Sequence, residues 1–257
     1  MSKIFPLTKT QRKNVIENQP QIEEEIQPVK GNIDVTVIAT KRPEILNIML
    51  RSFKENLSLS GEERLIINVD PVGLPIPQDD VIKVCYKYFK NVTYNTPTEG
   101  NATKALKWVW KQTTAEYVLS LEDDWELINR INVGRMISIM ERIPNLAQLS
   151  FRWTQLAKQY MRLEGYFYSP NFTGAPSLLR GSFARRTSEH MNDNLNFEKQ
   201  LKYYTKYSYL SFMNEYKYGQ YTSSNKLSGD IIDHGRGWMK KYKFGKNGTA
   251  ENFLTWR

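Results

Sequence analysis

The sequence has few residues that could cross-link the chain or carry it into a membrane. Its one cysteine, Cys85, excludes an intrachain disulfide. Only two histidines, His190 and His234, occur in 257 residues. No apolar run approaches the roughly 18 residues of a transmembrane helix, and the first residues lack the apolar core of a secretory signal. We therefore expect a cytoplasmic protein without a membrane span.

What the chain does have is ordinary globular composition and an excess of positive charge. Hydrophobic residues make up 40% and charged residues 25%, which is typical of a soluble domain with a full core. The 36 lysines and arginines outnumber the 27 acids and give a net charge of +9. This balance favours an anionic partner, whether nucleic acid, phosphate or an acidic surface, without choosing among them.

Secondary-structure patterns predict an α/β fold after a polar N-terminal extension at residues 1–31. From Asp34, short β-branched runs alternate with segments of helical spacing. The predicted strands are 34–40, 64–70, 91–96 and 115–121, and the predicted helices are 42–57, 79–89 and 100–114. Such alternation favours a doubly wound, mostly parallel sheet with helices on both faces.

The second half of the chain is less regular. We expect a helix at 133–143, a strand at 146–152 and a loop-rich, aromatic stretch at 153–180. Helices are predicted at 181–191 and 196–219, followed by a strand, a loop and a basic helix. Because no linker divides the chain, residues 32–257 are expected to form one domain.

Polar residues follow three of the predicted strands at the points where they end. Thr40 to Arg42, Asp70, and the acidic triplet Glu122–Asp124 occupy these positions. Ligands of doubly wound sheets bind outside the carboxyl ends of the strands, so these residues should meet at one edge. The triplet also precedes Trp125. Neighbouring carboxylates can share a hard divalent cation that holds a diphosphate, although a solvated turn after the strand is the alternative.

Four stretches in this order resemble the amino-terminal half of a GT-A-fold, nucleotide-sugar-dependent glycosyltransferase similar to family 2 enzymes. They read VTVIATKRPEIL, RLIINVD, EGNATKALKWVW and YVLSLEDDWEL. The triplet matches the DxD motif of that family, except that Glu122 replaces its usual first aspartate. The resemblance extends over about 34–246. It implies a nucleotide-sugar-binding half at 32–127 and an acceptor-binding half at 128–257.

The same resemblance implies a cofactor, a donor and a set of site residues. The cofactor would be Mn²⁺ or Mg²⁺, with Asp124 and His234 as metal ligands, and the donor a UDP- or GDP-sugar. The residues expected to contact the donor are Thr40, Arg42, Asp70, Asn101, Lys104, Glu122, Asp123, Arg236 and Lys240. Glu198 matches the position of the catalytic base of inverting members. It could instead be a first-turn helix acid, and a retaining enzyme would need no such base.

Two other functions remain open from the sequence. A nucleotidyltransferase also holds metal and phosphates with acids, but its glycine-rich, lysine-containing loop is missing from ATKRPEIL. A non-enzymatic nucleic-acid-binding protein fits the charge, whereas the acidic triplet argues against it. For a glycosyltransferase, the acceptor could be a glycan, a protein or DNA. Some compact viral enzymes that this sequence resembles glycosylate hydroxymethylated DNA bases.

Overall fold

The computed structural model of the chain describes residues 33–152, 162–163, 166–201, 210–221, 229–244, 246–247 and 255–256. The predicted extension at 1–31 therefore lies outside the described residues. Among the residues that are described, no helix is both long enough and apolar enough to cross a bilayer.

Among the described residues, the main sheet has nine strands in the order β3-β2-β1-β4-β9-β6-β10-β8-β7. Their bounds are β1 Ile33–Lys41, β2 Arg64–Gly73, β3 Val92–Asn95, β4 Tyr117–Glu122, β6 Leu146–Ser150, β7 Arg162–Leu163, β8 Tyr166–Ser169, β9 Ser177–Arg180 and β10 Lys217–Tyr221. Strands β1 to β4 pair in parallel. Within this sheet only β8 and β9 run against β1. The predicted mostly parallel sheet is confirmed.

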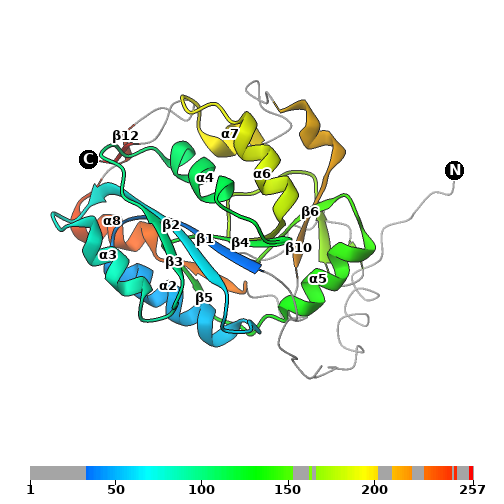
Figure 1. Cartoon of the computed structure of the whole chain (residues 1–257), viewed down its shortest axis with the longest axis horizontal. Coiled ribbons are helices and arrows are strands. Elements are labelled where there is room, and N and C mark those ends of the chain that lie inside the picture. Colours follow the sequence, from blue (N-terminus) through cyan, green and yellow to red (C-terminus); the bar gives the residue numbers. More distant parts are fainter. Residues whose placement is uncertain are drawn as a thin grey trace, which may run out of the picture.

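Helices cover both faces of the sheet, as predicted. Figure 1 shows α4, α6 and α7 on one face, α2, α3 and α5 on the other, and α8 near α2 and α3. The bounds are α2 Pro43–Asn56, α3 Gln78–Cys85, α4 Ala102–Lys111, α5 Val133–Arg142, α6 Gly181–His190, α7 Phe197–Leu201 and α8 Gly235–Tyr242, with a 3-10 helix at Ser211–Glu215. Two small sheets pair β5 (Trp125–Leu127) with β11 (Ile231–Asp233), and β12 (Lys246–Asn247) with β13 (Thr255–Trp256).

In the first half of the chain, the helices form close to where the sequence predicts. Pro43 stands in the first turn of α2, where its missing N–H leaves no helical bond unmade. In α4 the buried face is that of Leu106, Val109 and Trp110. Trp108, which helical spacing could also have placed inward, is only half-buried. The Trp110 ring meets Phe172 edge to face at 6.1 Å, so this helix is fixed firmly against its face of the core.

The second half contains strands that the sequence did not reveal. β8 and β9 lie in the stretch expected to be loops, and β10 begins at Lys217, inside a predicted helix. Only α7 and the 3-10 helix form in the rest of that predicted helix, apart from residues 202–209, which are not described. These strands are four or five residues long. Pairing with distant strands, rather than local pattern, gives such short segments their structure.

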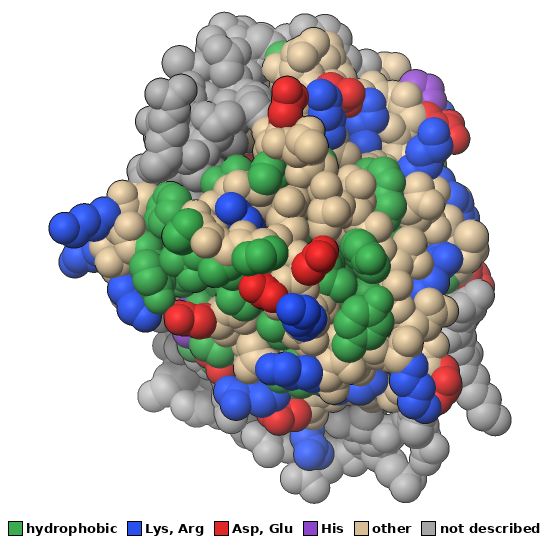
Figure 2. Space-filling model, turned by 60° about the vertical axis from the view of Figure 1, so that its left-hand side comes forward, with side chains coloured by type: hydrophobic (Ala, Val, Ile, Leu, Met, Phe, Trp, Pro, Cys, Tyr) green, Lys and Arg blue, Asp and Glu red, His purple; other side chains and the backbone are tan. Residues whose placement is uncertain are grey.

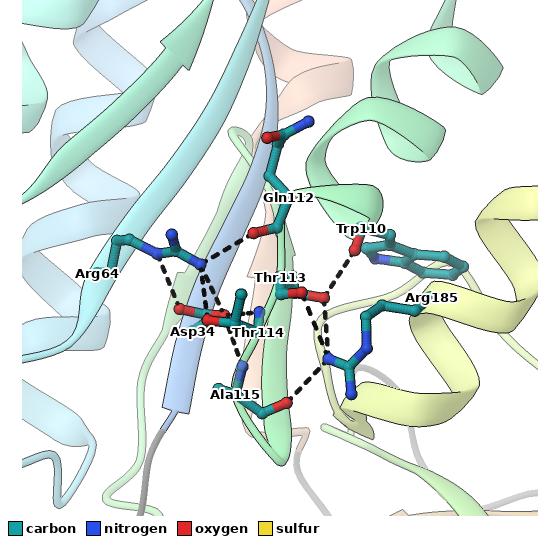
Figure 3. A network of polar contacts seen from close by, with 8 residues as sticks. All are labelled: Asp34, Arg64, Trp110, Gln112, Thr113, Thr114, Ala115 and Arg185. Atoms are coloured by element: carbon teal, nitrogen blue, oxygen red, sulfur yellow. Dashed lines mark hydrogen bonds and ion pairs between the residues drawn. The ribbon is translucent and has the colours of Figure 1, made fainter.

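A buried polar network ties the sheet together at the amino ends of its strands (Figure 3). The Asp34 carboxylate accepts two hydrogen bonds of 3.1 Å from Arg64 and others from the N–H groups of Thr114 and Ala115. Burial acts to raise the pKa of Asp34, but these hydrogen bonds lower it below its ordinary value. Arg185 of α6 donates to the carbonyl of Ala115. The network lies at the opposite edge from the carboxyl ends and is structural.

Candidate functional site

A cavity of about 500 Å³ opens at the carboxyl edge of the sheet. Figure 2 brings this side of the molecule forward and shows acidic and basic side chains close together among hydrophobic ones. Eight of the twelve predicted site residues line the cavity: Thr40, Arg42, Asp70, Glu122, Asp123, Asp124, Glu198 and Arg236. The convergence expected from the strand ends is therefore present.

Asp123, the middle acid of the triplet, is directed into the protein. Its side chain is 2% exposed and forms a buried ion pair with Arg42. The same carboxylate accepts hydrogen bonds from the backbone N–H of Thr40 at 2.9 Å and from the Thr40 hydroxyl at 3.2 Å. Asp123 thus holds the turn between β1 and α2. Arg42 also lies 5.5 Å from the centre of the Trp238 ring, which connects this pair to α8.

Glu122 and Asp124, the outer acids, face the cavity. Burial, reinforced by the charge of Asp124, raises the pKa of Glu122 to about 8. Burial also raises the pKa of Asp124 to about 6, although Arg42, 3.2 Å away, opposes this rise, while Asp123 and Asp233 add to it. One arginine thus serves more than one carboxylate, and the cavity wall carries a surplus of negative charge.

Gly235 allows two of these carboxylates to approach the start of α8. A Cβ at this position would overlap Asp124 Oδ2 and lie 3.2 Å from Asp233 Oδ1. Asp233 also accepts a hydrogen bond from the Gly235 N–H at 2.8 Å. Asp233 lines the cavity, although it was not among the site residues predicted from the sequence. Its place beside the triplet comes from the antiparallel pairing of β11 with β5, which sets Asp233 opposite Trp125.

Asp70 marks another wall of the cavity, at the end of β2. Asn68 donates to its Oδ1 at 2.8 Å, and the backbone N–H of Asn101 donates to its Oδ2 at 2.9 Å. Burial outweighs these hydrogen bonds and raises the pKa of Asp70 to about 6.

Glu198 lies in the first turn of α7 and lines the same cavity as the triplet. Its carboxylate passes close to Gly174, where a Cβ would lie 2.7 Å from Glu198 Oε1. The charge of Glu198 also contributes to the raised pKa of Glu122, after burial and Asp124. The two glutamates therefore belong to one electrostatic unit, although they come from distant parts of the chain.

Four predicted site residues do not line the cavity. Lys104 and Lys240 are exposed. Asn101 caps α4, its Oδ1 accepting from the N–H of Lys104 at 2.9 Å. His234 Nε2 lies 2.7 Å from Glu126 Oε2, so the imidazole is already paired with a carboxylate. The other histidine, His190, is exposed at the end of α6.

The donor set of the cavity fits a hard divalent cation. Asp124 and Asp233 offer oxygen ligands, which Mg²⁺ and Mn²⁺ prefer, and their surplus charge would be offset by a cation. Within the part of the chain that the structure describes, no three acidic, histidine or cysteine side chains form a ready metal-binding group. A cation here would thus need further ligands from a bound phosphate or from water.

Comparison with solved structures places this geometry in a known fold. One similar structure is S. aureus TarS 1–349 in complex with UDP-GlcNAc, with a TM-score of 0.52 and 11% identity, covering 77% of this chain and 57% of that chain. The fold is GT-A-like. A second GT-A-like structure is a mannosyltransferase from Pyrobaculum calidifontis in complex with GDP-Man and Mn²⁺, with a TM-score of 0.50 and 12% identity over 74% of this chain and 55% of that one.

The likeness is one of fold, and it confirms the fold class predicted from the four sequence stretches. The chain spans less than two thirds of the length of the TarS and mannosyltransferase chains. No protein-family model matches the sequence, and no curated protein matches it either.

The raised pKa of Glu122 leads to a testable pH dependence of stability. Between the ordinary value of 4.5 and about 8, the folded chain keeps a proton at Glu122 that the unfolded chain has lost. Stability must therefore fall as pH rises through this window. In metal-free buffer, Glu122→Gln should melt above the wild type at pH 9, and the difference should shrink towards pH 5.

Thermal melts of wild type and variant across this range, with EDTA present, measure the effect. The control is Glu189→Gln, a change at an exposed position of α6 that should shift the melting temperature little at any pH. A difference between Glu122→Gln and wild type that stays constant from pH 5 to pH 9 would contradict the assignment.

Proposed function

We propose that the protein is a metal-dependent glycosyltransferase that moves a sugar from a nucleotide-sugar donor to an acceptor hydroxyl with inversion. One observation carries the proposal: Asp70, the outer acids of the triplet and Glu198 line a single cavity at the carboxyl edge of a GT-A-like sheet. Of the similar structures, TarS is in complex with UDP-GlcNAc and the mannosyltransferase with GDP-Man and Mn²⁺, which supports a UDP- or GDP-sugar as donor.

Different residues of the cavity are proposed to contact the nucleoside and the diphosphate of such a donor. Asp70, at the end of β2, and Thr40, at the end of β1, are proposed to contact the nucleoside. Arg236 lines the cavity with its side chain 86% exposed, so its guanidinium can reach a diphosphate that enters from solvent. Arg–phosphate hydrogen bonds are strong because both partners are charged.

Asp124 and Asp233 are the residues that would hold Mn²⁺ or Mg²⁺. When bound, the cation would neutralise the diphosphate and stabilise its departure as a leaving group. Arg42 and the buried Asp123 fix the turn beside Asp124, which keeps the Asp124 carboxylate at the cavity wall. His234 is a less direct candidate for a ligand, since its Nε2 is engaged with Glu126.

Glu198 is the proposed general base. Its carboxylate enters the cavity from α7, whereas the triplet enters from β4, so an acceptor hydroxyl could lie between Glu198 and the donor sugar. Glu198 would accept the hydroxyl proton as the oxygen attacks the anomeric carbon and the bond to the diphosphate breaks.

The first prediction from this proposed function concerns the cation. Asp124→Asn should remove donor turnover, because the amide keeps the size of the side chain but not its charge. The assay incubates protein and Mn²⁺ with individual UDP- and GDP-sugars and measures nucleoside diphosphate release. Asp79→Asn, at an exposed position in α3, is the matched control. Full wild-type turnover in EDTA would exclude metal dependence, and pyrophosphate release from nucleoside triphosphates would favour a nucleotidyltransferase instead.

A second prediction separates the base from donor binding. Glu198→Gln should lower the transfer rate on the order of 10²–10⁴-fold, the usual contribution of a general base, while the affinity for the donor stays near that of wild type. Transfer rates at saturating donor and donor titrations by calorimetry measure the two effects. A wild-type transfer rate in this variant would return Glu198 to the role of a helix-start acid and favour retention.

DNA is the acceptor that we propose on the strength of charge, with a glycan or protein as the alternative. The α8 segment presents Lys240, Lys241 and Lys243 at exposed positions, and Arg236 of the same helix lines the cavity. Basic side chains beside a catalytic opening suit a polyanion, and duplex DNA releases counterions when lysines contact its phosphates.

Duplex binding should therefore weaken as salt rises, with a log–log slope of about −0.9 for each phosphate contacted. Lys240→Ala should make that slope less negative by about 1. Lys111→Ala, at the exposed far end of α4, should leave the slope unchanged. Binding of labelled duplex at several salt concentrations is measured together with sugar transfer to hydroxymethylated and plain DNA. Salt-insensitive binding and no transfer to either duplex would point to a glycan or protein acceptor.

A further inference from the structure

The segment from Asn192 to Asn196 determines where Glu198 lies. It leads directly into α7, described over Phe197–Leu201, and Glu198 is in the first turn of that helix. The contacts made by the preceding segment therefore help to place the start of α7 and the Glu198 backbone.

Side chains of α4 bind the carbonyl groups of this segment. The Thr103 hydroxyl donates to the Leu195 carbonyl at 2.6 Å. Asn101 Nδ2 donates to the Asp193 carbonyl at 3.1 Å. Lys107 Nζ donates to the Met191 carbonyl at 2.8 Å and pairs with Asp193 Oδ1 at 2.5 Å. Asn101, the N-cap of α4, and two residues of the helix thus bind three alternate residues: Met191, just before the segment, and Asp193 and Leu195 within it.

Gln200 binds the same segment from within α7. Its Nε2 donates to the carbonyls of Asn192 and Leu195 at 2.8 and 2.9 Å, and its Oε1 accepts from the Asn192 N–H at 2.7 Å. Gln200 is fully buried, so these hydrogen bonds do not compete with water. The Leu195 carbonyl is therefore shared between Thr103 of α4 and Gln200 of α7, and it is the point where the two helices are joined.

The first turn of α4 also contacts the opposite wall of the cavity. The Asn101 N–H donates to Asp70 Oδ2 at 2.9 Å, while the Asn101 side chain holds Asp193. Further along the same helix, Trp110 is buried in the core. A helix anchored in this way sets a fixed separation between Asp70 and Glu198.

We propose that Thr103 is a positioning residue for Glu198, and that Asn101 assists it by linking the Glu198 segment to Asp70. The proposal rests on the role of Glu198 as general base. Thr103 lines the cavity, but its side chain is only 1% exposed and its hydroxyl is bonded to the Leu195 carbonyl. A displacement of about 1 Å in a reacting group can cost on the order of 10²-fold in rate, so loss of one hydrogen bond here should be visible in turnover.

Thr103→Val and Thr103→Ser form the decisive pair, because valine keeps the shape without the hydroxyl and serine keeps the hydroxyl. We expect Thr103→Val to lower kcat for transfer by about 10- to 100-fold with the donor KM nearly unchanged, and Thr103→Ser to restore most of the rate. Thr36→Val is the control: Thr36 is buried in β1, and its hydroxyl has no hydrogen-bond partner among the described residues. Equal rates for Thr103→Val and Thr103→Ser, or an equal loss in Thr36→Val, would overturn the proposal.

Amide hydrogen exchange tests the same contact without relying on turnover. Exchange at 198–201 should be faster in Thr103→Val than in wild type, Thr103→Ser or Thr36→Val. If the wild type transfers no sugar, the proposed function fails, yet faster exchange would still support the positioning of α7 by Thr103. Unchanged exchange in Thr103→Val would refute that positioning.

A second pair covers the case in which Thr103→Val does not fold. Asn101 and Asn132 cap α4 and α5 in the same way, each accepting an N–H from the residue three positions later. Aspartate keeps the cap. Asn101→Asp replaces the donor to the Asp193 carbonyl by a charged acceptor, whereas Asn132→Asp adds the same charge at a cap whose side chain donates no such bond among the described residues. Asn101→Asp should lower kcat for transfer and speed exchange at 198–201. If its rate and exchange match those of Asn132→Asp, the proposal fails.

Discussion

The buried pair of Arg42 and Asp123 is the constraint on which the candidate site depends. Two charges at 3% and 2% exposure are costly to bury unless each is fully paired. Asp123 meets that requirement through Arg42 and Thr40. Removal of one partner from such a pair typically costs about 3–5 kcal/mol. The turn after β1 and the turn after β4 are therefore fixed to one another before any ligand arrives.

This pairing explains why three adjacent acids follow a central strand. With Asp123 directed inward, its neighbours Glu122 and Asp124 are left on the cavity side, where burial raises the pKa of both. The middle acid is thus the structural member of the triplet, and the outer two are the members with raised pKa values at the cavity. Carboxylates held this close repel one another when the site is empty, and a bound cation or cationic partner would offset that repulsion. Strongly shifted pKa values of this kind are concentrated at functional sites.

The sequence was sufficient for the first half of the fold and for eight of the residues that line the cavity. Parallel strands with β-branched cores have strong local patterns, and their carboxyl ends meet at one edge, so Asp70 and the triplet could be brought together without coordinates. β9 and β10 could not be predicted, because four- and five-residue strands such as SLLR and KYGQY gain their structure from pairing with β4, β6 and β8. Asp233 was missed for the same reason, since only the pairing of β11 with β5 places it beside Trp125.

The resemblance also predicted that Asn101 and Lys104 contact the donor. In the structure, side chains of α4 and its N-cap instead bind the segment that leads to Glu198. Residues spaced three or four apart lie on one face of a helix, so Thr103 and Lys107 act together on the Glu198 segment, and Lys104 is directed away from them. The helix that follows β3 thus connects two walls of the cavity that belong to different halves of the chain. Asp70 comes from the parallel half and Glu198 from the irregular half, and neither could be placed relative to the other by its own strand or helix. α4 therefore sets the distance between Asp70 and Glu198 across the cavity. Sequence changes in its first turn would alter that distance while the sheet and the acidic triplet stay as they are.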